Sequence, residues 1–267
     1  MSEPSPLLEN KHFDRMAVFR PENLMRETRR QKGLPPGTIP QVCVLDPDGD
    51  IIGHLLRRGE AERDPAWACY HTTLYRFNRG GFALGIIGCA VGGPFAVLLA
   101  EQLFVSGCEL LISITSAGQI LPVRDPPYFV LIEKALRDEG TSHHYLPPTR
   151  YVELLPEVNE CISGPVEDFT PSVERGTAWT TDAPYRETQE AIDAARGEGV
   201  LAVEMEAASL YAFAQAKKKP VVCFAHITNN MGLRAGDFEK GEEDWSVTSL
   251  RLVEAVGLAW KNAERLV

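Results

Sequence analysis

The sequence has few of the features that would tie the chain to a metal, a membrane or an oxidising compartment. Its six cysteines form no Cys-x-x-Cys pair and no His/Cys zinc spacing, and several lie in apolar runs. No stretch approaches 18 uninterrupted apolar residues, and the polar, proline-rich first ten residues lack the apolar core of a signal peptide. We therefore expect a soluble, cytoplasmic protein without a structural metal, a disulfide framework or a membrane partner.

Positive charge is also scarce. The chain carries 27 Lys and Arg against 37 Asp and Glu, a net charge of −10. Such a surface repels phosphate backbones, and the one basic run, Lys217–Lys219, directly follows an apolar helical pattern, where cations complement the helix dipole. The composition predicts no nucleic-acid partner.

The pattern of apolar residues predicts an α/β fold. An apolar strand over 82–89, a Gly-rich turn at 91–94, a helix to about residue 106 and a strand over 109–114 form a βαβ unit, which implies parallel strands. Further elements are expected as a short strand at 42–45, a helix at 204–217, a strand at 220–227 and a closing helix at 248–266. We expect one domain with a mixed, mostly parallel central sheet flanked by helices.

The first forty residues are poorly patterned. A short basic helix is expected from Pro21 to Arg30, and Gly and Pro residues follow it. No repeat, linker or break in composition divides the remainder. We treat 1–40 as an N-terminal extension and 41–267 as the catalytic domain.

Ligands of open α/β sheets bind at the carboxyl ends of the strands. Four segments lie there in this pattern, namely the acidic turn with Asp46, Asp48 and Asp50, the turn 90–94, the segment 115–118 and the segment 228–230. A fifth is Glu204-Met205-Glu206, at a strand-to-helix junction. One glutamate can face a ligand diol while the other supports the turn, but a helix-capping role explains such a residue equally well.

Several of these segments resemble the nucleoside phosphorylase superfamily, and in particular its uridine-phosphorylase-like branch. The similarity lies in Val203–Ala208, in Gly92-Gly93-Pro94 and in the segments 137–148 and 176–188. It spans roughly residue 42 to the C-terminus and implies a single-domain nucleoside phosphorylase-like fold. It also implies cleavage of the N-glycosidic bond of a small-molecule nucleoside, and self-association into a homodimer or a hexamer of dimers.

The resemblance assigns roles to individual positions. Glu206 and Met205 hold the ribose, with Glu204 and Gly92 beside them, and Ser116, with Ala117 and Gly118, contacts ribose or phosphate. Asn229 stands where adenosine-type members carry an acidic aspartate, which favours uridine-like or 6-oxopurine nucleosides over adenosine. Arg186 and Gln189 fall near the residues that read the base, and Pro184 replaces a stacking aromatic residue for which Trp179, Tyr185 or His144 are the candidate substitutes.

The sequence departs from the family where phosphate is bound. The glycine and arginine of a Gly-Asp-Pro-x-Arg turn are Leu45 and Gly49 here, and two further arginines are replaced by Ser113 and Cys69. Each Arg–phosphate hydrogen bond contributes about 1.5–3 kcal/mol, so losing three weakens phosphate binding severely.

Acidic residues occupy that turn instead. An aspartate among Asp46, Asp48 and Asp50 can accept a proton from an attacking water, although Asp46 and Asp48 can equally cap the turn. We therefore predict a hydrolytic, nucleosidase-like enzyme without a cofactor. The alternatives are a phosphorylase that uses inorganic phosphate as co-substrate through Arg57, Arg58 or Arg76, and a catalytically silent nucleoside-binding regulator.

Overall fold

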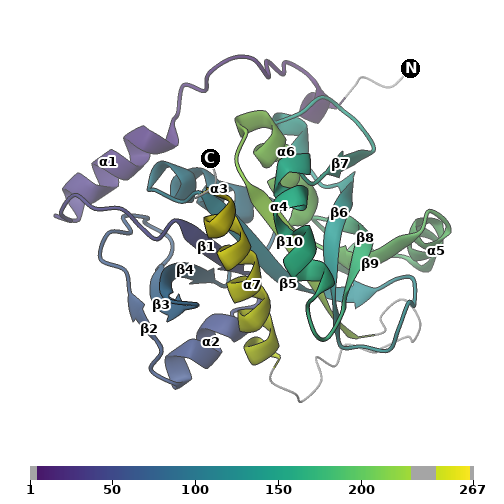
Figure 1. The fold of residues 1–267 in the computed structure, drawn as a ribbon. Helices are drawn as coiled ribbons and strands as arrows, with labels where there is room; N and C mark the ends of the chain where they lie inside the picture. Colours follow the sequence, from purple (N-terminus) through teal and green to yellow (C-terminus); the bar gives the residue numbers. More distant parts are fainter. Residues whose placement is uncertain (1–4, 230–244, 265–267) are drawn as a thin grey trace.

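The computed structural model describes residues 5–229 and 245–264, and the fold in that part of the chain is a mixed β-sheet with helices around it (Figure 1). Its strands are β1 (Val42–Asp46), β2 (Ala61–Arg63), β3 (Tyr75–Arg79), β4 (Phe82–Gly88), β5 (Leu110–Gln119), β6 (Tyr128–Asp138), β7 (Tyr151–Glu153), β8 (Val173–Thr181), β9 (Val200–Glu204) and β10 (Val221–Asn229). The strand order is β10-β6-β8-β9-β5-β1-β4-β3-β2, with β7 beside β6. The predicted α/β class with a mixed sheet is confirmed.

The sheet contains more antiparallel pairing than the sequence suggested. Within the described strands, five pairs are parallel and five are antiparallel. The long strands β5 and β6 account for three of the five antiparallel pairs, because each pairs with neighbours of both directions, and β3 accounts for the other two. As β10 pairs with both β5 and β6, strands β5, β10, β6, β8 and β9 close into a ring rather than leaving an open sheet.

The α-helices are α1 (Pro21–Gln31), α2 (Asp50–Arg57), α3 (Gly93–Val105), α4 (Pro156–Glu167), α5 (Gln189–Gly197), α6 (Ala207–Lys217) and α7 (Ser246–Glu264), and short 3-10 turns are η1 (Pro6–Leu8), η2 (Thr141–His144) and η3 (Pro184–Arg186). Helix α7 packs against both α2 and α4, and α6 packs against α3. No helix within the described residues is long and apolar enough to span a membrane.

The βαβ unit has the expected arrangement, because β4 and β5 flank β1 in parallel and α3 joins them. Two boundaries differ from the sequence prediction. Segment 115–118 does not follow a strand but forms the second half of β5, since it pairs with β10 and β9. The predicted helix 204–217 begins at Ala207, because Glu204 ends β9 and its carboxylate caps the helix.

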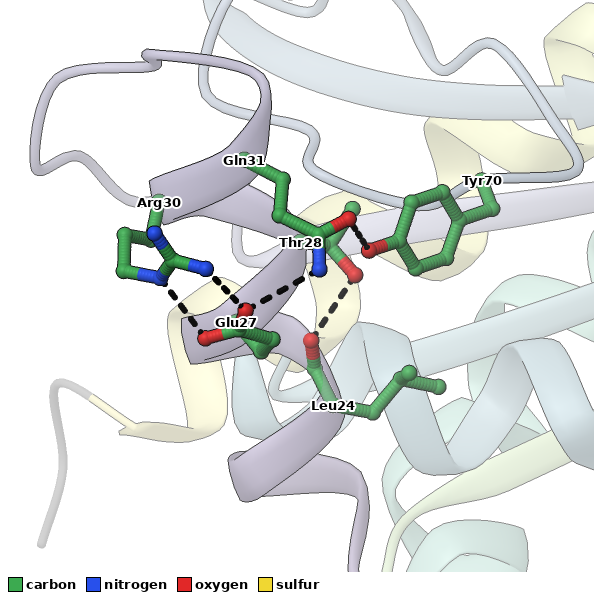
Figure 2. A network of polar contacts seen from close by, with 6 residues as sticks. All are labelled: Leu24, Glu27, Thr28, Arg30, Gln31 and Tyr70. Carbon is green, nitrogen blue, oxygen red and sulfur yellow. Dashed lines mark hydrogen bonds and ion pairs between the residues drawn. The ribbon is translucent and has the colours of Figure 1, made fainter.

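The N-terminal extension is tied to the body of the protein through α1. Tyr70 donates a hydrogen bond to Gln31 (2.6 Å), and Gln31 and Arg30 both donate to Glu27 (Figure 2). Arg29 also donates to the carbonyl of Ala66 (2.8 Å). The segment before α1 arches across the top of the molecule from η1 (Figure 1). Helix α1 packs on α3, so the extension is in contact with the main body. The boundary at residue 40 stays a prediction.

Candidate functional site

Glu206 lies at the junction of β9 and α6, in a cluster that we call the glutamate corner (Gly92, Thr180, Glu204 and Glu206). Its side chain is 1% exposed, and Oε1 accepts a hydrogen bond from the amide of Gly92 (2.7 Å). Its Oε2 is buried without a hydrogen-bond partner among the described residues. A buried polar oxygen of this kind is costly unless a ligand satisfies it, so Oε2 is available for a ligand hydroxyl.

The glycines before α3 bring this helix close to α6. Gly92 adopts φ +92°, in the region that favours glycine, and a Cβ on Gly93 would lie 2.1 Å from Oγ of Ser209 on α6. The two glycines therefore allow the backbone amide of residue 92 to reach Glu206.

Glu204 supports the turn instead of facing a ligand. Its Oε2 accepts from the amides of Glu206 (2.7 Å) and Ala207 (2.8 Å), and its Oε1 accepts from the hydroxyl of Thr180. We therefore correct the expected substrate-binding role of Glu204, because the residue is 4% exposed and its carboxylate already accepts three hydrogen bonds from the turn and Thr180.

Three carboxyl groups are buried together in this region. Glu139, at 6% exposure, accepts from the hydroxyl of Ser209 (2.5 Å) and lies close enough for its charge to act on Glu204. Burial, followed by the charge of Glu204, raises the pKa of Glu206, and the Gly92 amide and the Thr115 hydroxyl offset part of this rise. Burial likewise raises the pKa of Glu204. The cluster therefore favours retaining a proton.

The second part of the site is the aspartate turn (residues 46–50), which joins β1 to α2. Asp46 is 2% exposed and accepts from the amides of Ile52 (2.9 Å) and Gly49 (3.2 Å). Burial raises the pKa of Asp46 to about 7, and its backbone hydrogen bonds only partly oppose that rise. Asp46 caps the turn and the start of α2 and is almost completely buried, which fits a structural role, and its expected role as a base for water stays a prediction.

Asp48 points in another direction, to β5. Its Oδ2 accepts from the amide of Ser116 (2.6 Å), and its Oδ1 accepts from the Ser116 hydroxyl (2.8 Å). One carboxylate thus takes both donors of the residue that the resemblance assigns to ribose or phosphate. Asp50 is exposed at the first position of α2, and its carbonyl accepts from the hydroxyl of Ser246 (3.2 Å).

None of the three positions at which the family carries a phosphate-binding arginine offers a positive charge to an anion here. Gly49 adopts φ +81°, and a Cβ there would lie 2.7 Å from Sγ of Cys89, so an arginine cannot be placed without a shift. Ser113 is 1% exposed and its hydroxyl has no hydrogen-bond partner within the described residues. Cys69 is 2% exposed and accepts from the amide of His71.

The arginines that were candidates for a rebuilt anion site have other contacts. Arg58 pairs with Glu60 (2.6 Å), and Arg76 donates two hydrogen bonds to the buried carboxylate of Asp64. Arg57 is exposed at the end of α2. The described residues contain no group of three or more His, Cys, Asp or Glu arranged to hold a metal ion.

On the base side, the structure overturns one expectation. Trp179 is 5% exposed, packs among Ile120, Ile192 and Val203, and donates its indole N–H to Asp138 (2.9 Å). Successive residues of a strand face opposite sides, so Trp179 points away from the side on which Thr180 reaches Glu204. We correct its role to core packing.

No hydrogen bond or ion pair within the described residues links the other base-side candidates to the glutamate corner. The side chain of Tyr185 is 99% exposed, and Arg186 is exposed beside it. Gln189 begins α5 and donates to Asp193 (3.0 Å), while His144 is exposed on η2 and lies 3.0 Å from Nζ of Lys11. A role for these residues in reading the base stays a prediction.

The remaining predicted residues lie on the strands that frame the site. Met205 is half-buried on the turn before α6, and Ala117 and Gly118 are buried in β5. Asn229 ends β10, where its backbone pairs with Gly118, and its side chain lies outside the described residues.

Sequence reasoning missed Thr180 and Glu139. The hydroxyl of Thr180 accepts from the amide of Ala208 (2.9 Å) while it donates to Glu204, so it fixes the first turn of α6. Each residue contacts a partner more than twenty positions away, so no local pattern assigns it a role. The one available signal was that both stand in the segments 137–148 and 176–188, which carry the resemblance.

With this geometry in place, comparison with known proteins identifies the family. A profile of the phosphorylase superfamily matches residues 42–256, most of the chain and every residue of the glutamate corner. The chain belongs to the phosphorylase superfamily, which confirms the resemblance.

Two named relatives are enzymes that act on nucleosides. The chain is 29% identical over 168 residues to a guanosine phosphorylase of Halorubrum lacusprofundi, which covers 61% of this chain and 67% of that protein. It is 27% identical over 221 residues to a uridine phosphorylase of Thermococcus kodakarensis, covering 72% and 79%. An uncharacterized protein of Acanthamoeba polyphaga mimivirus is 30% identical over 162 residues, and the match spans 58% of each chain.

Solved structures show the same fold. An AMP nucleosidase from Bacteroides thetaiotaomicron superposes with a TM-score of 0.69 at 19% identity, covering 91% of this chain and 99% of that one. A uridine phosphorylase from Vibrio fischeri gives 0.67 at 16% identity, covering 82% and 92%.

Proposed function

We propose that the protein cleaves the N-glycosidic bond of a nucleoside with water, without a phosphate co-substrate. The observation that carries this proposal is the pairing of Asp48 with the amide and the hydroxyl of Ser116. A phosphate bound at Ser116 needs those two donors, and here a carboxylate of the chain itself accepts from both. The charges of Asp48 and Asp50 both act on Asp46, so this corner repels a dianion.

In the proposed reaction, the ribosyl group gains positive charge as the base departs. Glu206 binds the ribose hydroxyls through Oε2 and, when ionised, stabilises that charge in a buried site. A carboxylate has about four acceptor positions, so Asp48 can hold Ser116 and still accept a proton from water. The water oxygen bonds to the anomeric carbon, the bond to the base breaks, and the base leaves with the bonding electron pair.

The base proposed is one that carries carbonyl groups. The expectation rests on Asn229 and is supported by the relatives named guanosine phosphorylase and uridine phosphorylase, since guanine and uracil both bear carbonyls. Self-association into a homodimer or a hexamer of dimers is likewise a proposal that follows from the family.

The test is to identify the products of cleavage in phosphate-containing buffer. We expect free ribose and base from the wild-type chain, and a large loss of rate in Asp48→Asn, because an amide cannot accept the proton from water. Glu190→Gln, an exposed change on α5, is the control. Ribose 1-phosphate as the product would establish phosphorolysis instead, and ligand binding without turnover of any nucleoside would establish a binding protein.

A further inference from the structure

We propose that Glu204 is a positioning residue for Glu206: together with Thr180 it fixes the turn that aims Glu206, and its carboxylate is held against the backbone amide of Glu206, where its charge acts on the Glu206 side chain. This inference rests on the proposed function, because Glu206 is taken to bind the ribose. Glu204 itself contacts no substrate in this account.

The first observation is a continuous set of hydrogen bonds. Thr180 on β8 joins the carboxylate of Glu204 to the amide of Ala208, and Glu204 holds the amides of Glu206 and Ala207. Three successive backbone amides, from 206 to 208, are thereby fixed to two side chains. Both are almost completely buried, at 0% exposure for Thr180 and 4% for Glu204, so no rotation of the turn is possible without breaking these bonds.

The second observation is the charge around Glu206. The carboxylates that act on it are Glu204 and, from the aspartate turn, Asp48, while Glu139 at the end of β6 acts on Glu204. Tyr211 on α6 and Cys223 on β10 are the other titratable groups near the pair, and both are neutral at neutral pH because burial raises their pKa values. No positive side chain is among the largest influences on Glu204 or Glu206, so removing the charge of Glu204 makes Glu206 ionise more easily.

Glu204→Gln separates charge from shape. The amide oxygen of glutamine still accepts from the turn, and its NH₂ group donates to Thr180, so the fold is retained while one charge is lost. We expect the acidic limb of the pH profile of kcat/KM to move to lower pH by about one unit or more. A loss of rate with an unmoved limb would overturn the inference.

Ionisation of Glu206 is also measured without a substrate, by NMR titration of ¹³C-carboxyl-labelled glutamate in the full chain, with Glu206→Gln used to assign the signal. The Glu206 midpoint should fall in Glu204→Gln and stay in Glu190→Gln. This measurement tests the inference even if no nucleoside is cleaved, an outcome that would contradict the proposed function alone. An unchanged midpoint would overturn the charge coupling.

Thr180 tests the positioning role. In Thr180→Val, the amide of Ala208 and one oxygen of Glu204 lose their partner, and we expect kcat/KM to fall about 10- to 100-fold. Thr180→Ser should restore it, since serine keeps the hydroxyl. Thr181→Val alters the adjacent buried threonine, which caps the following turn through the amide of Ala183, and is the matched control. Equal activity of the two valine variants would overturn the positioning role.

Discussion

The glutamate corner and the aspartate turn lie at the same edge of the sheet, yet they relate to the family in different ways. In the glutamate corner, the Glu-Met-Glu and Gly-Gly-Pro segments are present, and they meet in the hydrogen bond from Gly92 to Glu206. In the aspartate turn, the expected arginine is Gly49, and a carboxylate accepts from Ser116. In the proposed function, the sugar side of the site is retained while the anion side carries the opposite charge.

The difference shows why family membership does not settle the reaction. Binding a ribosyl group needs an acceptor for its hydroxyls, and in the proposed function Glu206 supplies one whether water or phosphate attacks. In the proposed function, the choice of nucleophile depends instead on the charge beside Ser116 on β5. Substitutions in the two regions should therefore have separable effects.

The largest effect is expected from Glu206→Gln in the glutamate corner. Losing the charged acceptor should lower kcat/KM by about 30- to 1000-fold, or about 2–4 kcal/mol of transition-state stabilisation, while the far-UV circular dichroism stays that of the wild type. Steady-state kinetics against Glu190→Gln as control measure it. Near-wild-type activity in a folded variant would show that Glu206 only begins the helix.

The choice of base should produce the next largest effect. Uridine or inosine should be cleaved about 100-fold or more faster than adenosine, because a site that reads base carbonyls leaves buried polar groups unpaired against adenine. A side-by-side assay of the three nucleosides decides it. If adenosine reacts fastest, Asn229 does not face the base.

Gly49→Ala probes the packing of the aspartate turn. The new Cβ meets Sγ of Cys89 at 2.7 Å in a left-handed conformation, so the free energy of unfolding should fall by about 2–3 kcal/mol. Gly59→Ala has a similar positive φ of +68° but no atom within 4 Å, and should lose only about 1 kcal/mol in urea unfolding. Equal losses in the two variants would mean that Sγ of Cys89 does not obstruct a Cβ at position 49. Adding Cys89→Ala to Gly49→Ala should recover part of the lost free energy of unfolding.

The smallest effect concerns pH. The folded protein holds a proton on Asp46 up to a pKa of about 7, above the ordinary value of 3.8, so it binds more protons than the unfolded chain between these values. Stability from this group therefore falls as pH rises through that window. Between pH 6 and pH 8 the wild type should lose about 1–2 kcal/mol more than Asp46→Asn in urea unfolding. Parallel pH dependence of the two proteins would show that Asp46 is ionised normally.

The sequence predicted the elements around the site better than the direction of individual side chains. Glu206 and Gly92 were found because short motifs determine their local geometry. Trp179, one of three candidates to stack on the base, lies in the core instead. It faces away from the side on which Thr180 reaches Glu204, and nothing in the sequence links Thr180 to Glu204, 24 residues away. Asp46 and Asp48 are two positions apart, and the shape of the turn, with Gly49 at positive φ, decides that one caps the helix and the other reaches Ser116.

The most direct test of the account is the rate of nucleoside cleavage by the full-length wild-type chain as inorganic phosphate is raised from zero. A carboxylate at Ser116 in place of a phosphate site predicts full turnover without phosphate, free ribose as the product and no increase as phosphate is added. A rate that starts near zero and rises to saturation with phosphate would contradict the central claim.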